Sequence, residues 1–91
     1  MSRRLVVTPR ALRDLKQIGD YIAADSPRAA VRLVSVLRAD LDKLASFPFM
    51  AQAVGGHSRF RRLPHGAYVV FYEVTDDAVL VRSIVHSATL K

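Results

Sequence analysis

The candidates in this sequence for action on a phosphate are seven arginine, tyrosine and histidine residues in the second half of the chain. They are Arg59, Arg61, Arg62, Tyr68, Tyr72, Arg82 and His86. RNA cleavage by 2′-hydroxyl attack needs cations that stabilise the phosphorane and a group that moves protons. These side chains can fill both roles without a metal. The structural alternative is that Arg62 and Arg82 are ion-pair partners and that the tyrosines are half-buried in a sheet.

Other kinds of chemistry find less support in the residue pattern. Apart from Glu73, the acidic residues fall on predicted helices or in turns, so paired-carboxylate catalysis is not expected. The three histidines share no short ligand spacing, and the chain has no cysteine, so neither a metal nor a cofactor is expected. Gly55-Gly56 lacks the Lys-Ser/Thr of a phosphate-binding loop.

A short apolar segment suggests a site of a different kind. Phe47-Pro48 ends a predicted helix, and Phe47 is expected to close that helix onto the core. Phe49 and Met50 follow the proline in a loop, where two large apolar side chains are hard to bury. They either form an exposed patch for a partner or fold under the edge of the sheet.

The net charge of +6 is unevenly spread along the chain. Residues 1–13 contain four arginines and no acid, and residues 48–72 contain Arg59, Arg61 and Arg62 and no acid. Residues 14–47 are balanced, with five bases and five acids. The two basic segments suit either phosphate or an acidic protein. The alternative is a solvated surface with unbalanced arginines.

Length and composition predict one small domain over residues 1–91. An apolar content of 51% is ordinary for a globular chain, and the absence of cysteine excludes a disulfide scaffold. The apolar runs are far shorter than the ~20 residues that cross a bilayer, and Leu5–Val7 is too short for a signal peptide. A cytoplasmic domain without membrane contact is expected.

The first half of the chain predicts a short strand and a helical hairpin. Leu5–Val7 is the strand, and Thr8-Pro9 and Ser26-Pro27 each combine a capping side chain with a proline at the first helical position. Apolar residues then recur at helical spacing: Ala11, Leu15, Ile18 and Ile22 in the first helix, and Ala30, Leu33, Val34, Leu37, Leu41 and Leu44 in the second. The short turn between these stripes predicts an antiparallel pair of helices.

The second half predicts strands. Phe60–Leu63, Ala67–Val74 and Ala78–His86 are the candidates, and residues 48–58 are expected to be a loop. Along a strand, Arg59 and Arg61 share one face and Arg62 takes the other. The predicted fold class is α+β, in the order β-α-α-β-β-β, with the helical hairpin packed on a mainly antiparallel four-stranded sheet.

Several segments in this order carry a resemblance to a known family. They are Thr8-Pro9-x-Ala11-x-x-Asp14-Leu15, Tyr21-Ile22, Asp25-Ser26-Pro27, Leu44-x-x-Phe47-Pro48, Arg62-Leu63-Pro64-x-Gly66-x-Tyr68-Val69-Val70-Phe71-Tyr72 and Val81-Arg82-x-Ile84-Val85-His86. Each segment alone is weak, but together they span nearly the whole chain. The sequence resembles the RelE/ParE superfamily of bacterial toxins, specifically its ParE-like branch.

The resemblance implies the toxin of a type II toxin–antitoxin module. Such a toxin forms a hetero-oligomer with a cognate antitoxin, which is often acidic, carries a DNA-binding dimer domain and alone brings the complex to operator DNA. The residues expected to bind antitoxin or target are Arg59, Arg61, Arg62, Phe49, Met50, Tyr68, Arg82 and His86. A basic surface with an apolar anchor suits such a partner.

The branches of the superfamily differ in their target. RelE-like members cut ribosome-bound mRNA, whereas ParE-like members inhibit DNA gyrase. The tail after His86 reads Ser87-Ala88-Thr89, which departs from the Gly-Ala-Arg common in ParE-like chains. RNase members commonly carry basic residues along the central strand and a tyrosine near the C-terminus, whereas here the strand segment Tyr68–Tyr72 holds no arginine or lysine and no tyrosine follows His86. Gyrase inhibition is therefore favoured.

Two alternatives stay open. The first is a RelE-type, ribosome-dependent mRNA endonuclease that uses Arg62, Arg82 and His86. The second is a nucleic-acid-binding module in which the helical pair acts as a helix-turn-helix, although the long matched stripes favour an antiparallel hairpin.

Overall fold

The computed structural model describes residues 3–90, apart from the side chain of His57, so the predicted domain bounds at residues 1 and 91 lie outside the described residues. The chain begins with strand β1 (Arg4–Val7), followed by helices α1 (Pro9–Ala23) and α2 (Pro27–Ser46). Both predicted caps are confirmed, because Thr8 accepts from the Ala11 N–H and Ser26 accepts from the Ala29 N–H. The Thr8 hydroxyl also donates to the Val81 carbonyl at 2.7 Å, which ties the start of α1 to the sheet.

Four more strands complete the sheet: β2 (Gln52–Val54), β3 (His57–His65), β4 (Tyr68–Val74) and β5 (Ala78–His86), followed by the 3₁₀ turn η1 (Ser87–Thr89). The strand order is β1-β5-β4-β3-β2. All neighbours are antiparallel except β1 and β5, which pair in parallel. The α+β class and the helical hairpin are confirmed, but the sheet has five strands, and the predicted count of four is wrong.

The strand missing from the prediction is β2, in a segment expected to be a loop. Gly55 and Gly56 have φ values of 62° and 77°, and they form the tight connection between β2 and β3. Two adjacent positive φ values are what a two-residue hairpin turn requires, and glycine adopts them without steric cost. The glycine pair therefore marks a hairpin turn.

Strand β3 is also longer than the predicted Phe60–Leu63, and it continues through Pro64. Pro64 pairs with Val69 of β4, whereas the pairing of β2 with β3 reaches no further than Arg62. On the outer side of Pro64, β3 therefore acts as an edge strand, where the missing proline N–H takes no ladder bond away.

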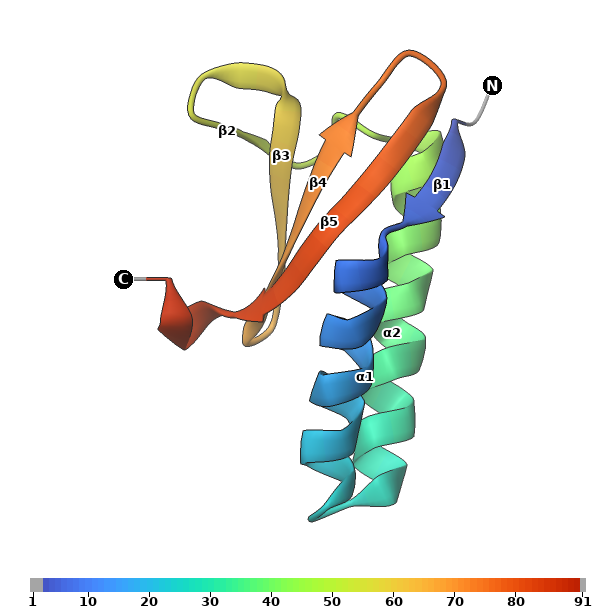
Figure 1. Ribbon diagram of the computed structural model, residues 1–91, viewed down its shortest axis with the longest axis vertical. Helices are drawn as coiled ribbons and strands as arrows, with labels where there is room; N and C mark the ends of the chain where they lie inside the picture. The colour runs from blue at the N-terminus through green and yellow to red at the C-terminus, as the bar shows by residue number, and fades with distance from the viewer. Residues whose placement is uncertain (1–2, 91) are drawn as a thin grey trace.

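The helical hairpin covers one face of the sheet, and the connected ends of the helices extend beyond it (Figure 1). Buried helix residues, among them Leu15, Leu37 and Leu44, form one core with sheet residues such as Val70 and Val81. We call the opposite face, which carries no helix, the open face. Side chains alternate between these two faces along each strand, and this alternation decides which predicted residues can meet.

The loop after α2 differs from expectation at Phe47. This side chain is 64% exposed, so the prediction that it closes α2 onto the core is wrong. Pro48 is buried instead, and its carbonyl accepts a 2.7 Å hydrogen bond from the hydroxyl of the buried Tyr72. This bond fixes the loop against the core and leaves Phe47 directed at solvent.

Candidate functional site

The arginines of β3 point to different faces of the sheet, as the alternation predicted. Arg61 pairs with the core residue Tyr72, whereas Arg62 pairs with Phe71, the neighbour that takes the open face. Arg61 therefore lies on the helix-covered side, toward the loop before β2. Arg62 lies on the open face.

Arg61 holds that loop to β3. Its Nη1 donates to the carbonyls of Ala51 at 2.6 Å and Phe49 at 3.3 Å, and its Nε donates to the Ser58 carbonyl at 2.6 Å. The guanidinium also lies 4.8 Å from the centre of the Phe49 ring. The Arg61 guanidinium thus makes three hydrogen bonds and one ring contact within the chain, so Arg61 organises the loop.

A second arginine reaches the same ring from the start of the chain. The Arg3 guanidinium lies 5.3 Å from the Phe49 ring centre, and its Nε donates to the Thr75 carbonyl at 2.9 Å. We define the loop cluster as the exposed apolar residues of this loop and the arginines around them. Its members are Phe47, Phe49, Met50, Arg3, Arg59 and Arg61.

The exposure of the loop cluster agrees with the alternative in which Phe49 and Met50 form an exposed patch. Phe49 is 52% exposed and Met50 is 47% exposed, so neither folds under the sheet edge. Burial beneath this loop raises the pKa of Tyr72, with a smaller opposing effect from the Arg61 charge. Tyr72 is therefore a neutral hydrogen-bond donor of the core.

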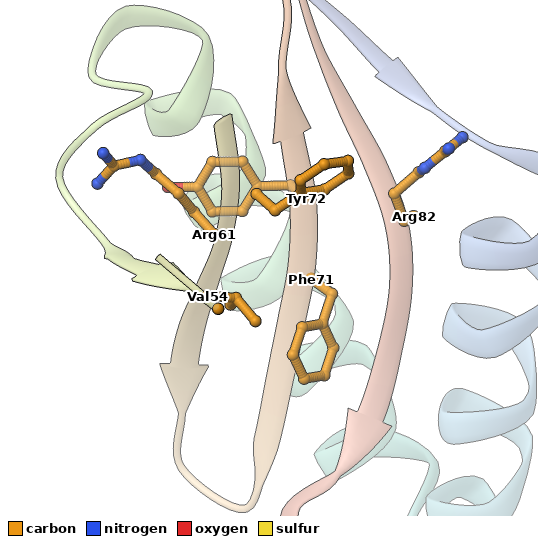
Figure 2. A pocket seen from close by; sticks show the side chains of 7 residues that line it. Val54, Arg61, Phe71, Tyr72 and Arg82 are labelled. Atoms are coloured by element: carbon orange, nitrogen blue, oxygen red, sulfur yellow. The ribbon is translucent and has the colours of Figure 1, made fainter. Parts of the chain in front are cut away.

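An apolar hollow of about 320 Å³ lies along β3 and β4, where Val54, Phe60 and Phe71 line it. Figure 2 shows Val54 and Phe71 beside the hollow, whereas the Arg61 side chain points away from it toward the loop before β2. Arg82 borders the hollow from β5. This hollow was not predicted from the sequence, although alternation along β3 and β4 puts Phe60 and Phe71 on the same, open face.

Arg82 is already paired on the open face. Its Nη2 lies 3.5 Å from Oε1 of Glu73, so the structural alternative of an ion pair applies to Arg82. No ion pair or hydrogen bond of the Arg62 side chain is found among residues 3–90. Arg62 and Arg82 therefore share a face, but Glu73 neutralises the charge of Arg82, whereas the charge of Arg62 is open to a partner.

Tyr68 and His86 meet elsewhere, at the end of the sheet beside α1. They are paired across β4 and β5, with ring centres 5.2 Å apart in an edge-to-face arrangement. His86 Nδ1 accepts the Ala88 N–H at 3.1 Å and so caps η1. Together with Asp14 and Tyr21 they line a groove of about 510 Å³ on the helix-covered side, which we call the end groove.

A bulge in β5 explains why His86 is on that side. The register shifts because Tyr72 pairs with Val81 while Phe71 pairs with Ser83, which leaves Arg82 as the extra residue. After the bulge, even-numbered residues face the helices, so Ile84 joins the core. Simple alternation along the sequence misses this change of phase.

Asp14 is one of the acids on a predicted helix to which the sequence assigned no chemistry, and the structure gives it a defined role. Its Oδ2 accepts the Ile84 N–H at 3.0 Å, just past the bulge, and its side chain is only 17% exposed. Arg10 lies 3.7 Å from the same oxygen. Asp14 therefore fastens α1 to β5 at the border of the end groove.

Asp14→Ala is expected to leave the Ile84 N–H without its partner and to lower the free energy of unfolding by about 1–2 kcal/mol. In a domain of this size, that corresponds to a fall in Tm of roughly 5–15 °C in a thermal melt. Asp20→Ala is the matched control, because among residues 3–90 the Asp20 carboxylate makes only an exposed ion pair with Lys16. Equal shifts for both variants would contradict the role given to Asp14.

The predicted site residues thus fall into three places. Phe49, Met50, Arg59 and Arg61 belong to the loop cluster, Arg62 and Arg82 to the open face, and Tyr68 and His86 to the end groove. Within the described residues, no three His, Asp or Glu side chains gather as they would around a metal. None of the helices in that part of the chain is long and apolar enough to span a membrane.

Comparison with known proteins gives a consistent family match. Residues 5–90 match the family described as the ParE toxin of the type II toxin–antitoxin system parDE. Two similar proteins of Caulobacter vibrioides are Toxin RelE1, 35% identical over 94% of this chain and 95% of that toxin, and Toxin RelE2, 37% identical over 96% and 98%. These relatives are matched over nearly their full length.

Solved structures share the fold. The chromosomal ParDE system from P. aeruginosa matches with a TM-score of 0.79 at 19% identity, over 93% of this chain and 96% of that one. A double mutant of E. coli toxin RelE in the free state gives 0.71 at 19% identity, over 98% of this chain and 87% of that one. The RelBE2 toxin–antitoxin complex from Mycobacterium tuberculosis gives 0.65 at 19% identity, over 94% and 99%.

Proposed function

This chain belongs to the ParE toxin family of type II toxin–antitoxin systems, and from that premise we propose that it binds and inhibits DNA gyrase rather than cutting RNA. An antitoxin is its partner. Gyrase as the target comes from the ParE-like branch that the sequence resembles. The proposal places the toxin, its antitoxin and its target in the cytoplasm.

The observation that carries the proposal is the separation of the groups that RNA cleavage would need. Arg62 and Arg82 lie on the open face, while His86 lies on the helix-covered side beside Tyr68. A phosphorane needs its cations and its proton-transfer group within hydrogen-bond reach of one phosphate. Two faces of one sheet do not offer that arrangement.

The bonds already made by these groups point the same way. Arg82 is paired with Glu73, and His86 Nδ1 is engaged as the cap of η1. The central strand β4 adds no cation, because Tyr68–Val74 contains neither lysine nor arginine. The residues favour contact with a protein over chemistry on a phosphate.

The test is a pair of assays on the same purified toxin. Gyrase supercoiling should be blocked at stoichiometric amounts of toxin and restored when the antitoxin is added first. Toeprinting on translating ribosomes should show no new stops. New stops with intact supercoiling would overturn the proposal in favour of RelE-type cleavage, the alternative left open by the sequence; the Caulobacter relatives carry the name RelE. The triple variant Arg62→Ala, Arg82→Ala, His86→Ala would then have to lose those stops.

A further inference from the structure

Three large apolar side chains stand exposed on a loop whose backbone is fixed. Phe47, Phe49 and Met50 are 64%, 52% and 47% exposed. The backbone carbonyls that flank Phe49 and Met50 are held, since Tyr72 donates to Pro48 at 2.7 Å and Arg61 to Ala51 at 2.6 Å. A held loop that presents apolar side chains is typical of a protein contact surface.

The charges around these side chains narrow the choice of partner. A hollow of about 380 Å³ between Phe49 and the β4–β5 turn is bordered by Arg3 and Arg59, against one carboxylate, Asp76. Arg61 adds a third guanidinium beside the Phe49 ring. The surface is therefore basic around an apolar centre, so an acidic partner is favoured and a second copy of the same basic surface is disfavoured.

Nucleic acid fits the loop cluster less well than protein. Arg61 donates from Nε and Nη1 to three carbonyls, so most of its guanidinium fork is unavailable to a phosphate. Two guanidiniums already lie over the Phe49 ring, where a base would have to stack. The side chains left open for contact, Phe47 and Met50, are anchors suited to apolar groups of a protein.

We propose that the loop cluster is a docking surface for an acidic segment of the antitoxin. An apolar side chain of that segment lies against Phe47 and Met50, and flanking carboxylates meet the guanidiniums of Arg3 and Arg59. The cation–π contacts on Phe49 fix the surface before binding, which lowers the entropy lost when the segment docks. This docking site rests on the antitoxin partner given in the proposed function, and it is independent of whether the target is gyrase or the ribosome.

The apolar contact is tested by titrating purified toxin with the antitoxin encoded beside it, using calorimetry. The double variant Phe47→Ser, Met50→Ser is expected to raise Kd by roughly 10–100-fold. Val36→Ser is the matched control, because Val36 is an apolar side chain 39% exposed on α2, and its Kd should stay within about threefold of wild type. Thermal melts of both variants verify the fold. A wild-type Kd for the folded double variant would overturn the proposal.

The charge contact is tested by making the same charge change at two positions, one inside the loop cluster and one outside it. Arg59→Glu is expected to weaken binding by roughly tenfold or more and to reduce its salt dependence. Arg28→Glu, an equal change at an exposed residue in the first turn of α2, should have much less effect. If both variants lose the same antitoxin affinity, the loss comes from the change in net charge, and the docking site is overturned. Loss of single-stranded RNA binding in Arg59→Glu, with antitoxin binding intact, would assign the surface to nucleic acid and overturn it as well.

Discussion

Arg61→Ala is expected to lower the free energy of unfolding by about 2–3 kcal/mol, because one guanidinium holds three carbonyls and an aromatic ring. The bonds reach Ala51 and Phe49 in the loop and Ser58 at the start of β3. Alanine leaves the partly buried Ala51 carbonyl without a donor and frees the loop from the sheet. In a thermal melt, Tm should fall by roughly 10–20 °C.

Arg62→Ala is the control for this prediction, because it removes the same side chain one residue later on the other face of β3. Arg62 makes no ion pair or side-chain hydrogen bond found within residues 3–90, so its Tm should stay near that of wild type. Arg61→Lys is informative too, because a single ammonium cannot reproduce the planar fork, and its Tm should lie between those of wild type and Arg61→Ala. Equal melting curves for the two alanine variants would contradict the prediction that Arg61 stabilises the loop against β3.

The parts of the fold that follow from neighbouring residues were predictable. Thr8-Pro9 and Ser26-Pro27 set the starts of both helices through local hydrogen bonds. The apolar residues at helical spacing indicate which face of each helix packs into the core. Strand β2 was not predictable, since three residues carry no clear period and their pairing depends on two glycines in a rare conformation. The parallel pairing of β1 with β5 joins residues more than seventy positions apart, so no local pattern indicates it.

The site was predictable in its residue types more than in its grouping. Alternation correctly separated Arg61 from Arg62, but the bulge at Arg82 changed the phase of β5 and carried His86 to the helix-covered side. The contact of Arg3 with Phe49 depends on the start of the chain lying beside the end of α2, where the Arg3 N–H donates to the Ala45 carbonyl at 2.8 Å. Such a meeting of distant segments has no signature within either segment.

Leu37→Ala is expected to lower the free energy of unfolding by about 2–5 kcal/mol, because it empties part of the core. Leu37 is completely buried, and α2 brings it into the same cluster as Val79 and Val81 of the sheet. A domain of this length has roughly 5–14 kcal/mol of stability in total, so the loss is a large fraction of it. Val36→Ala, one residue earlier and 39% exposed, should change the stability by no more than about 0.5 kcal/mol.

The gain in stability on antitoxin binding separates a folding defect from a binding defect. Leu37 lies in the core and does not reach the surface, so Leu37→Ala leaves the loop cluster intact. A partner that binds only the folded toxin adds about 2.7 kcal/mol of stability when its free concentration is one hundred times Kd. The free Leu37→Ala toxin should therefore melt far below wild type, and the antitoxin should stabilise it by the same amount as it stabilises wild type. Phe47→Ser, Met50→Ser should show the reverse, with a near-normal melt alone and little gain from the antitoxin. A Leu37→Ala toxin that melts like wild type when free would contradict the core assigned to α2.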